Sequence, residues 1–399
     1  MSWINEILDV HKEYESPLPF WYWAGLTSIS AVVKDNVWVE RGLYKSYANI
    51  YVILHADSGL KKGPPIAMAN QLVHAVDNTT IIYGRSSIQA ILKKLGTAET
   101  MPGGKVVGDS KGFICASELA ASLVEDPAAL GILTDLYDRI FHSNAYVSLL
   151  KSETFTLKSP TVSLLGGIND AHAESLFTKR DIQGGFIARC FIVHESKRNA
   201  VNALIDLPDK VPDYKELAKY LKVLASLRGS FAPLAGTGAG DLYKEWYHGF
   251  VKQIEEQNTK DSTGTLNRFS ESVMKVAMLL ALSEKPELVI SRDAMEQAIE
   301  HCQKLIGNVR HTTLGAGKHL YAIEKAILIK ELVGRNPHII SREQVNRKYF
   351  MNASLKDWSE VALQLEAAGI IKIVNHGVQV MYEMTPEQVD AWEKHFRGR

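Results

Sequence analysis

Cysteine is scarce in this sequence, and apolar runs of membrane-spanning length are absent from it. Its three cysteines, Cys115, Cys190 and Cys302, are scattered without a Cys-x-x-Cys or a histidine pairing. That spacing predicts buried thiols in a reducing compartment and argues against a zinc site. No apolar run is long enough to span a bilayer, and the first residues do not resemble a signal peptide. We therefore expect a cytoplasmic protein with no membrane partner.

Neither sign of charge is in excess. Lys+Arg and Asp+Glu number 45 each, so no overall basic charge marks the chain as a nucleic-acid-binding protein, and any such site must be a local patch. Apolar residues, in contrast, make up 46% of the 399 residues. That is enough for the cores of two or three domains.

The apolar patterns predict four segments. Residues 1–48 are expected to form helices and a hairpin, and the aromatic stretch PFWYW is expected to dock on another domain. Residues 49–205 alternate short strands with helices, which is typical of a parallel sheet covered on both faces. Residues 206–315 are mostly helical, and residues 316–399 show three helices and a hairpin, the pattern of a winged helix. The expected sheet strands are Tyr51–Leu54, Thr80–Tyr83, Gly112–Ala116, Thr161–Gly166 and Arg189–Val193.

The stretch ILHADSGLKKGPPI, residues 53–66, has the layout of a phosphate-binding loop between a strand and a helix. Against the pattern Gly-x-x-x-x-Gly-Lys-Ser/Thr, Ala56 stands at the first glycine and Lys61 at the second. Lys62 keeps the lysine, whereas Gly63 replaces the hydroxyl residue. Gly59 and the helix N-terminus can still cradle an anion. The expected nucleotide-binding residues of the loop are Ala56, Asp57, Ser58, Gly59, Leu60, Lys61, Lys62 and Gly63.

Four more polar residues stand where an ATPase would need them. Glu118 follows a buried strand in GFICASEL and fits a residue that polarises the attacking water. Asn169, after SLLGGI, could orient that water. Arg189, before an apolar strand, and Arg268, at the start of an amphipathic helix, could meet phosphate charge. Each also has an ordinary interpretation, as a turn, loop or surface ion-pair residue, and for Arg268 the ordinary interpretation is favoured.

In this order the motifs resemble a family of phage, plasmid and mobile-element P-loop proteins of replicative-helicase type. ADSGLKKG (56–63) resembles that family's APSG-x-R-K-S loop, and GGFIARCF (184–191) its GGFLARF-like strand. The chain is also distantly similar to the minichromosome maintenance class of AAA+ helicases. That class has CIDEF, a sensor residue and LSRFD where this chain has CASEL, GGIND and IARCF. The resemblance implies an α/β fold with a P-loop NTPase core of AAA+ or RecA-like type, a helical lid and a C-terminal winged helix.

The resemblance also implies residue roles, cofactors and partners. Lys62 would contact the β- and γ-phosphates, Glu118 would activate water, and Asn169 would act as the sensor. Arg189 would reach into a neighbouring subunit's site, and Arg268 would touch the γ-phosphate from the lid. ATP and Mg²⁺ would be the cofactors. The partners would be single-stranded or forked DNA, further copies of the chain in a ring that could be hexameric, and a primase or polymerase.

Two departures from these motifs concern the metal. Gly63 removes the hydroxyl that would hold Mg²⁺, and Ser117 stands where a second carboxylate would help. If the metal binds through the nucleotide, Ser58, Asp57 or Glu118 would have to assist. Nucleotide binding is therefore a firmer expectation than efficient hydrolysis.

DNA contacts are expected in two places. By resemblance, residues 143–160 occupy the position of a hairpin that grips DNA in a ring channel, with Lys151 and Lys158 as its basic residues. In the C-terminal segment, Arg347 and Lys348 make the second helix basic. Protein contact by that segment is nearly as well supported as DNA contact.

Three functions remain open on the sequence alone. The leading one is an ATP-dependent, DNA-translocating helicase acting in replication of a phage or mobile element. The second is a replication-initiation module that binds DNA and nucleotide but hydrolyses the nucleotide weakly or not at all, which the altered metal positions favour. The third, a P-loop kinase of small molecules, is disfavoured by the expected winged helix and trans-acting arginine.

Overall fold

The computed structural model describes residues 2–84, 86–100, 104–106, 110–119, 128–138, 145–149, 154–169, 173, 185–202, 213–256, 264–318, 322–349, 355–376 and 379–397. The chain divides into two compact units, Met1–Thr313 and Leu314–Arg399. Each unit has hydrophobic core of its own.

A five-stranded sheet with parallel neighbours throughout forms the centre of the first unit. Its spatial order is β11-β3-β10-β7-β4. The strands are β3 (Tyr51–His55), β4 (Thr80–Tyr83), β7 (Lys111–Ala116), β10 (Thr161–Ile168) and β11 (Cys190–His194). The predicted α/β fold with a parallel sheet is confirmed, and it is compatible with a P-loop type of core. Four of the five strands differ from their predicted bounds by one or two residues. The difference that concerns a site residue is at Arg189, which ends a short 3-10 helix, η1 (Ile187–Arg189), rather than starting the strand.

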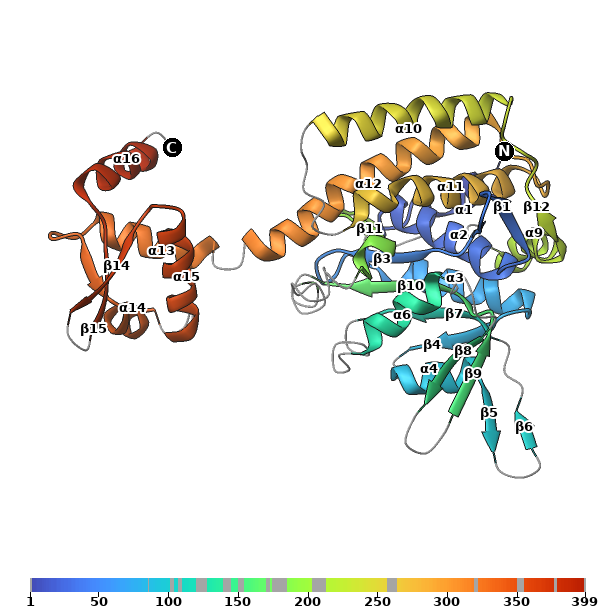
Figure 1. Ribbon diagram of the computed structural model, residues 1–399, viewed down its shortest axis with the longest axis horizontal. Coiled ribbons are helices and arrows are strands. Elements are labelled where there is room, and N and C mark those ends of the chain that lie inside the picture. Colours follow the sequence, from blue (N-terminus) through green and yellow to red (C-terminus); the bar gives the residue numbers. More distant parts are fainter. Residues whose placement is uncertain are drawn as a thin grey trace. The chain divides into compact units, whose positions relative to one another are not determined.

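Helices cover both faces of this sheet (Figure 1). Side chains of a strand alternate between faces, and on β3 Val52 and Leu54 join one core cluster while Tyr51 and Ile53 join the other. The first face is covered by α2 (Leu18–Val33) and α3 (Gly63–Val76), together with helices from later in the chain. The second is covered by α4 (Ile88–Leu95) and α6 (Ala129–Asp138).

The aromatic stretch PFWYW lies in α2, at the heart of the first core. Phe20, Trp21, Tyr22 and Trp23 are each at most 8% exposed, and almost the whole helix is buried. A helix that is apolar all round must be covered on every side. The neighbours include α1 (Trp3–His11), α3 and α11, so the expected docking of the aromatic stretch is an internal contact of the first unit.

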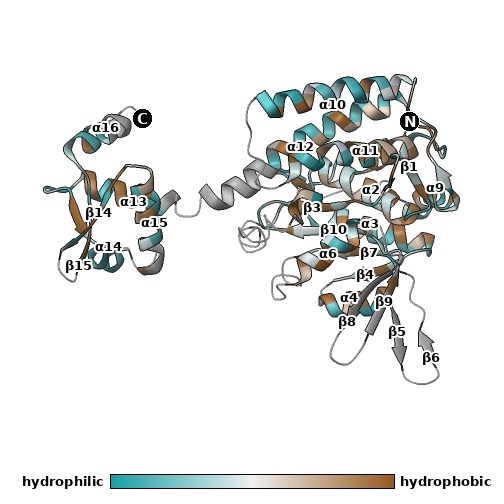
Figure 2. Cartoon of the chain, in the orientation of Figure 1, coloured by the Kyte–Doolittle hydropathy of each residue, from teal (hydrophilic) through white to brown (hydrophobic). Residues whose placement is uncertain are grey.

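The remaining elements of the first unit flank the central sheet. They include a small sheet of order β12-β1-β2 and helices that pack on the first face or, like the largely hydrophilic α10, lie mostly exposed (Figure 2). Their bounds are β1 (Val37–Glu40), β2 (Lys45–Tyr47), β12 (Gly229–Ser230), α9 (Tyr214–Ser226), α10 (Gly238–Glu256), α11 (Thr265–Glu284) and α12 (Arg292–Lys318).

A separate antiparallel sheet, of order β6-β5-β9-β8, also belongs to the first unit. It is built from β5 (Thr97–Thr100), β6 (Gly104–Val106), β8 (Ala145–Leu149) and β9 (Thr154–Lys158). The pairing of β8 with β9 places antiparallel strands in the segment expected to form a hairpin. Lys151 lies outside the described residues, and Lys158 is placed only by its backbone in β9.

The second unit contains three helices followed by antiparallel strands, as the sequence pattern predicts. Ser341 and Gln344 make the expected capping box, with both reciprocal hydrogen bonds. Beyond the prediction, a short strand, β13, joins the hairpin in a sheet of order β13-β15-β14, and a final helix follows. The bounds are α13 (Ala322–Val333), β13 (Ile339–Ser341), α14 (Arg342–Lys348), α15 (Leu355–Ala367), β14 (Lys372–His376), β15 (Gln379–Glu383) and α16 (Pro386–Arg397).

Candidate nucleotide site

The loop Ala56–Gly63 leaves the sheet at the point where the direction of its connections reverses. After β3 the chain passes to α3 on the first face, whereas after β10, the neighbour of β3, it passes to residues of the second-face cluster such as Ala173. In open parallel sheets, ligands bind outside the carboxyl ends of strands at such a switch point. The strand order therefore places the loop where a ligand site is expected.

The backbone of the loop is shaped for an anion. Gly59 and Lys61 have left-handed φ angles of 95° and 50°, and Lys62 returns to the right-handed helical region as the N-cap of α3. Alternation of this kind turns successive N–H groups toward one side. A non-glycine residue with positive φ is strained and often functional. Here the Ser16 hydroxyl donates to the Lys61 carbonyl at 2.7 Å and helps to hold it.

Lys62 folds its side chain back over the loop. Its Nζ donates to the carbonyl oxygens of Ala56 at 2.6 Å and Asp57 at 3.0 Å. The ammonium thus lies against the turn that phosphates would occupy, and charge-assisted contacts to phosphate would be stronger than these. That Lys62 contacts the phosphates of a nucleotide stays a prediction.

Glu118 and Asn169 lie at the same edge of the sheet as the loop. Glu118 is exposed two residues beyond β7, and Asn169 is half-buried directly after β10. The Leu119 amide donates to the Gly167 carbonyl at 2.9 Å. A Cβ at Gly167 would come within 2.5 Å of the Ser117 carbonyl, so glycine is required for this turn to close on β10.

The spacing between these groups suits a phosphate and a water molecule. In the sheet, β10 separates β3 from β7, which puts the loop and Glu118 about two strand spacings, or roughly 10 Å, apart. Asn169 follows the strand between them, and the Ala56 amide donates to the carbonyl of Ile168, the residue before Asn169, at 3.4 Å. The structure therefore brings together the loop and the two expected catalytic residues Glu118 and Asn169.

The site fits a polyphosphate better than it fits a metal held by protein side chains. Gly63 contributes no ligand, although a Cβ there would meet nothing within 4 Å. The exposed side chains of Asp57, Ser58 and Glu118 carry oxygen atoms of the kind that ligate a metal bound to a nucleotide. Among the described residues, no group of three or more His, Cys, Asp or Glu is placed to hold a metal.

An aromatic cavity of about 340 Å³ opens beside the loop strand, at the carboxyl end of β11. Its walls include Tyr22, Trp23, His194, Glu195 and His301. The Tyr22 and His301 ring centroids are 4.5 Å apart. Within the described part of the chain the Tyr22 hydroxyl has no hydrogen-bond partner although it is buried. Burial raises the pKa of Glu195 and lowers that of His301.

This aromatic cavity is connected to the loop through two contacts. His194 is paired in the sheet with His55, the residue before the loop, and their ring centroids are 4.8 Å apart. Ser16, which holds Lys61, lies two residues before α2, whose first turns line the cavity. A planar base could stack here while its phosphates reach the loop.

The two expected arginines lie together at the opposite edge of the sheet. Arg189 is 7% exposed. Its Nε donates to Asp138 Oδ1 at 3.0 Å, a second guanidinium nitrogen donates to Asp138 Oδ2, and Nη1 donates to the Gly185 carbonyl at 2.5 Å. Arg268 also pairs with Asp138, at 3.3 Å. We refer to Asp138, Arg189 and Arg268 as the arginine cluster.

The arginine cluster is distant from the loop of its own chain. Cys190, which follows Arg189, pairs with Tyr51, the first residue of β3, whereas the loop follows the last residue of that strand. The separation along the strand is roughly 16 Å at the usual rise per residue. Within one chain the arginine cluster therefore lies at the amino edge of the sheet and the loop at its carboxyl edge, and the roles of both arginines stay predictions.

The basic residues of the second unit are only partly available to DNA. Lys348 donates to Glu331 Oε1 at 2.6 Å, and that carboxylate also accepts from Tyr349 and Arg335. These contacts lower the pKa of Glu331 against the opposing effect of burial. Arg347 on the same helix is exposed. The charge expected at Lys348 is thus largely compensated, and Arg347 is the more accessible of the two.

Sequence reasoning did not find Ser16, Tyr22 or His194 as site residues. The aromatic stretch containing Tyr22 was the one local signal, and it indicated packing. Among the helices described, none combines the length and apolar character needed to cross a bilayer. No protein-family model matches the chain, and no curated protein matches it significantly.

Proposed function

We propose that the first unit binds ATP on the loop Ala56–Gly63 and that the protein is an ATP-dependent, DNA-translocating protein of helicase type. The observation that carries the nucleotide site is the loop itself, strained at Lys61 and located at the switch point of a parallel sheet. The aromatic cavity supports a nucleoside as the remainder of the ligand. DNA as the partner rests on the resemblance of the motifs.

In this proposal each group has a physical task. The amides of the loop and the Lys62 ammonium neutralise the phosphates. Glu118 accepts a proton from the attacking water, and Asn169 orients that water from the tip of β10. Mg²⁺ would screen the phosphate charge, with Asp57, Ser58 and Glu118 as the oxygen groups near it.

The arginine cluster would act on the site of a neighbouring subunit. Arg189 is buried and bidentate to Asp138, whereas Arg268 has 43% of its side chain exposed. Arg268 is therefore the better placed to reach across an interface, with Arg189 fixing Asp138 behind it. Mixing Arg268→Ala with Lys62→Ala protein should restore part of the ATPase activity that each lacks, because some interfaces then combine two intact halves. Absence of rescue in a confirmed assembly would contradict a shared site.

The alternative of a nucleotide-binding initiation module without efficient hydrolysis keeps one specific support. Gly63 and Ser117 occupy the two positions where metal ligands are expected, and neither supplies one of the usual type. This alternative uses the same loop and the same cavity. It differs only in turnover.

The test is calorimetric ATP binding to wild type and to Lys62→Ala, followed by ATPase assays with and without single-stranded DNA. Loss of the ammonium should weaken ATP binding tenfold or more, about 1.4 kcal/mol. Lys12→Ala, which removes an exposed lysine directly after α1, is the matched control. Equal affinity for ATP in all three proteins would rule out the loop as the nucleotide site.

Stimulation of turnover by DNA supports a translocating protein, and binding without turnover supports the initiation module. If the wild-type protein hydrolyses ATP, Glu118→Gln should retain ATP binding, and its hydrolysis rate should be lower by about 10²-fold or more. A Glu118→Gln rate equal to that of wild type would reduce Glu118 to a residue of the turn.

A further inference from the structure

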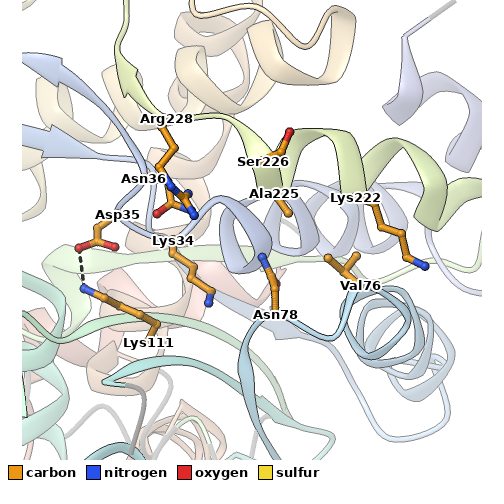
Figure 3. A pocket seen from close by; sticks show the side chains of 10 residues that line it. All are labelled: Lys34, Asp35, Asn36, Val76, Asn78, Lys111, Lys222, Ala225, Ser226 and Arg228. Carbon is orange, nitrogen blue, oxygen red and sulfur yellow. Dashed lines mark hydrogen bonds and ion pairs between the residues drawn. The ribbon is translucent and has the colours of Figure 1, made fainter.

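Besides the aromatic cavity, a polar cavity lies at the amino edge of the central sheet, away from the loop. It encloses about 510 Å³. Its cationic lining consists of Lys34, Lys111, Lys222 and Arg228, and Asp35 is its one carboxylate (Figure 3). We call these five residues the basic basin.

The location of the basic basin follows from the elements that form it. Lys111 is the first residue of β7, Lys34 caps the end of α2, and Lys222 and Arg228 belong to the last turns of α9 and the residues after it. Asn78, which follows α3, completes the wall. These residues lie at the first residue of a sheet strand or at the C-terminal ends of helices on the first face. The basin and the loop therefore occupy opposite edges of the sheet.

The simplest explanation of these cations is that they offset helix dipoles, and it does not suffice. Three helices, α2, α3 and α9, end at the basin, and each C-terminus carries about −0.5 charge, or about −1.5 together. Four cationic side chains against one carboxylate leave three net positive charges. The lining of the basin therefore carries more cationic than anionic side chains, although the chain as a whole has a net charge of zero.

One basin lysine joins this cavity to the outer sheet. Lys111 Nζ donates at 2.5 Å both to Asp35 and to the carbonyl of Ser159, the residue after β9. The Asp35 contact is drawn in Figure 3. The base of the β8–β9 pair, where Lys158 stands, is thus fixed directly beside the basin. A chain of phosphates passing along these strands would meet the basin next.

We propose that the basic basin contacts the backbone phosphates of single-stranded nucleic acid. Helix C-termini rather than N-termini face it, so it offers no ring of amide donors for one small, enclosed anion. Its cations instead stand on long, flexible stems around an open depression, and Lys222 and Arg228 are exposed. Such an arrangement suits a polyanion, whose binding is driven by release of counterions and needs no closed geometry. The assignment relies on the proposed function only for the kind of polyanion.

The test removes the two exposed cations together. Lys222→Ala with Arg228→Ala is compared with Lys215→Ala with Lys219→Ala, which removes two exposed lysines from the same helix outside the basin. Binding of a fluorescent single-stranded oligonucleotide is measured by anisotropy over a range of salt concentrations. The basin variant should lose roughly tenfold in affinity at low salt, and its log–log salt slope should be smaller by about 1.4, because a single strand gives about 0.7 per contact.

Four outcomes would overturn the proposal, and one of them points to a small-anion site instead. The proposal is overturned if the salt slope of the basin variant equals that of wild type. It is also overturned if the basin and control variants lose the same oligonucleotide affinity. An oligonucleotide that fails to bind wild type at low salt overturns it as well. Inorganic tripolyphosphate is tested on Lys62→Ala protein, with and without the basin changes. If the basin changes abolish tripolyphosphate binding but leave the salt slope for the oligonucleotide unchanged, the basin is a small-anion site instead.

ATP affinity separates this proposal from the nucleotide function. It should be the same in wild type and in the basin variant, because the loop lies at the other edge of the sheet. If wild type binds no ATP while the basin variant still loses oligonucleotide affinity, the nucleotide function fails and the basin stands. A charge-reversed protein, Lys222→Glu with Arg228→Glu, should bind the oligonucleotide more weakly than the alanine variant, and equal binding by both would count against direct phosphate contact.

Discussion

Gly63 is the residue at which the loop departs most from a metal-binding phosphate loop. It is the first residue of α3, and a Cβ there would meet nothing within 4 Å. Gly63→Ser should therefore fold normally and place a hydroxyl where Mg²⁺ is expected beside the phosphates. We expect ATP affinity to become several-fold more dependent on Mg²⁺ than in wild type, measured by calorimetry with Mg²⁺ and with a chelator.

The matched control for this change is Gly63→Ala. It alters the backbone entropy in the same way but supplies no oxygen. An equal gain in both variants would assign the effect to loop stiffness. No gain in either would place the metal elsewhere.

His11 provides a pH-dependent contribution to stability. It is fully buried, stacks on Trp21 with a centroid distance of 3.7 Å, and its ring nitrogens meet the Ile7 carbonyl at 2.7 Å and the Tyr214 hydroxyl at 3.0 Å. Burial lowers its pKa from 6.5 to about 4. The unfolded chain therefore takes up a proton between pH 6.5 and pH 4 while the folded chain does not, and folding stability falls across that window as pH decreases.

The expected loss for His11 is up to about 3 kcal/mol at one pKa unit per 1.36 kcal/mol. Urea unfolding of wild type and His11→Gln at several pH values measures it. The variant should be less stable at pH 7 but should lose less stability on acidification. Parallel pH profiles for the two proteins would show that His11 titrates normally in the folded state.

At the residue scale, the sequence predicted those site residues that form a local pattern. The loop, Glu118 and Asn169 each follow an apolar strand, and parallel strands bring their carboxyl ends to one edge. Ser16 could not be predicted, because its bond to the Lys61 carbonyl spans 45 residues and leaves no periodic signal. Nor did the sequence predict the left-handed φ of Lys61, because the carbonyl of this residue is held by the distant Ser16.

The junction of η1, α6 and α11 depends on one acid shared by two arginines. Arg189→Ala leaves Asp138 with only Arg268 and removes a nearly buried guanidinium. We expect the unfolding free energy to fall by about 2 to 3 kcal/mol. This is at or below the loss on breaking a fully buried ion pair, because Asp138 is partly exposed. Arg268→Ala should cost less than about 1 kcal/mol. Urea denaturation compares them, and equal small losses would mean that Arg189 does not organise the junction.

At the element scale, strands were easier to predict than their neighbours. The sheet strands are buried on both faces, so each appears as a continuous apolar run. Their spatial order depends on which face each crossover takes, and that is decided by helices distant in sequence, such as α2 packing on β10. The sequence therefore predicted the strands of the site but not the separation of the loop from the arginine cluster.

For the whole molecule, separate cores predict separate unfolding. Trp358 is fully buried in the core of the second unit, whose apolar residues form a cluster of their own. Trp358→Ala should remove about 3 to 5 kcal/mol from that unit and shift one of two calorimetric transitions, while ATP binding by the first unit stays at the wild-type value. A single transition that shifts as a whole would show that the two units unfold together.

Opposite placement of the loop and the arginine cluster on one sheet also constrains symmetry. If the cluster of one subunit completes the loop of the next, each contact joins unlike surfaces. A two-fold dimer satisfies this only where two reciprocal contacts form across one interface, whereas a head-to-tail assembly repeats one contact between successive subunits. A closed ring completes as many sites as it has subunits, whereas an open helical assembly always leaves one loop without its arginine at one end. Catalytic output per subunit would then rise on closure, although no residue changes.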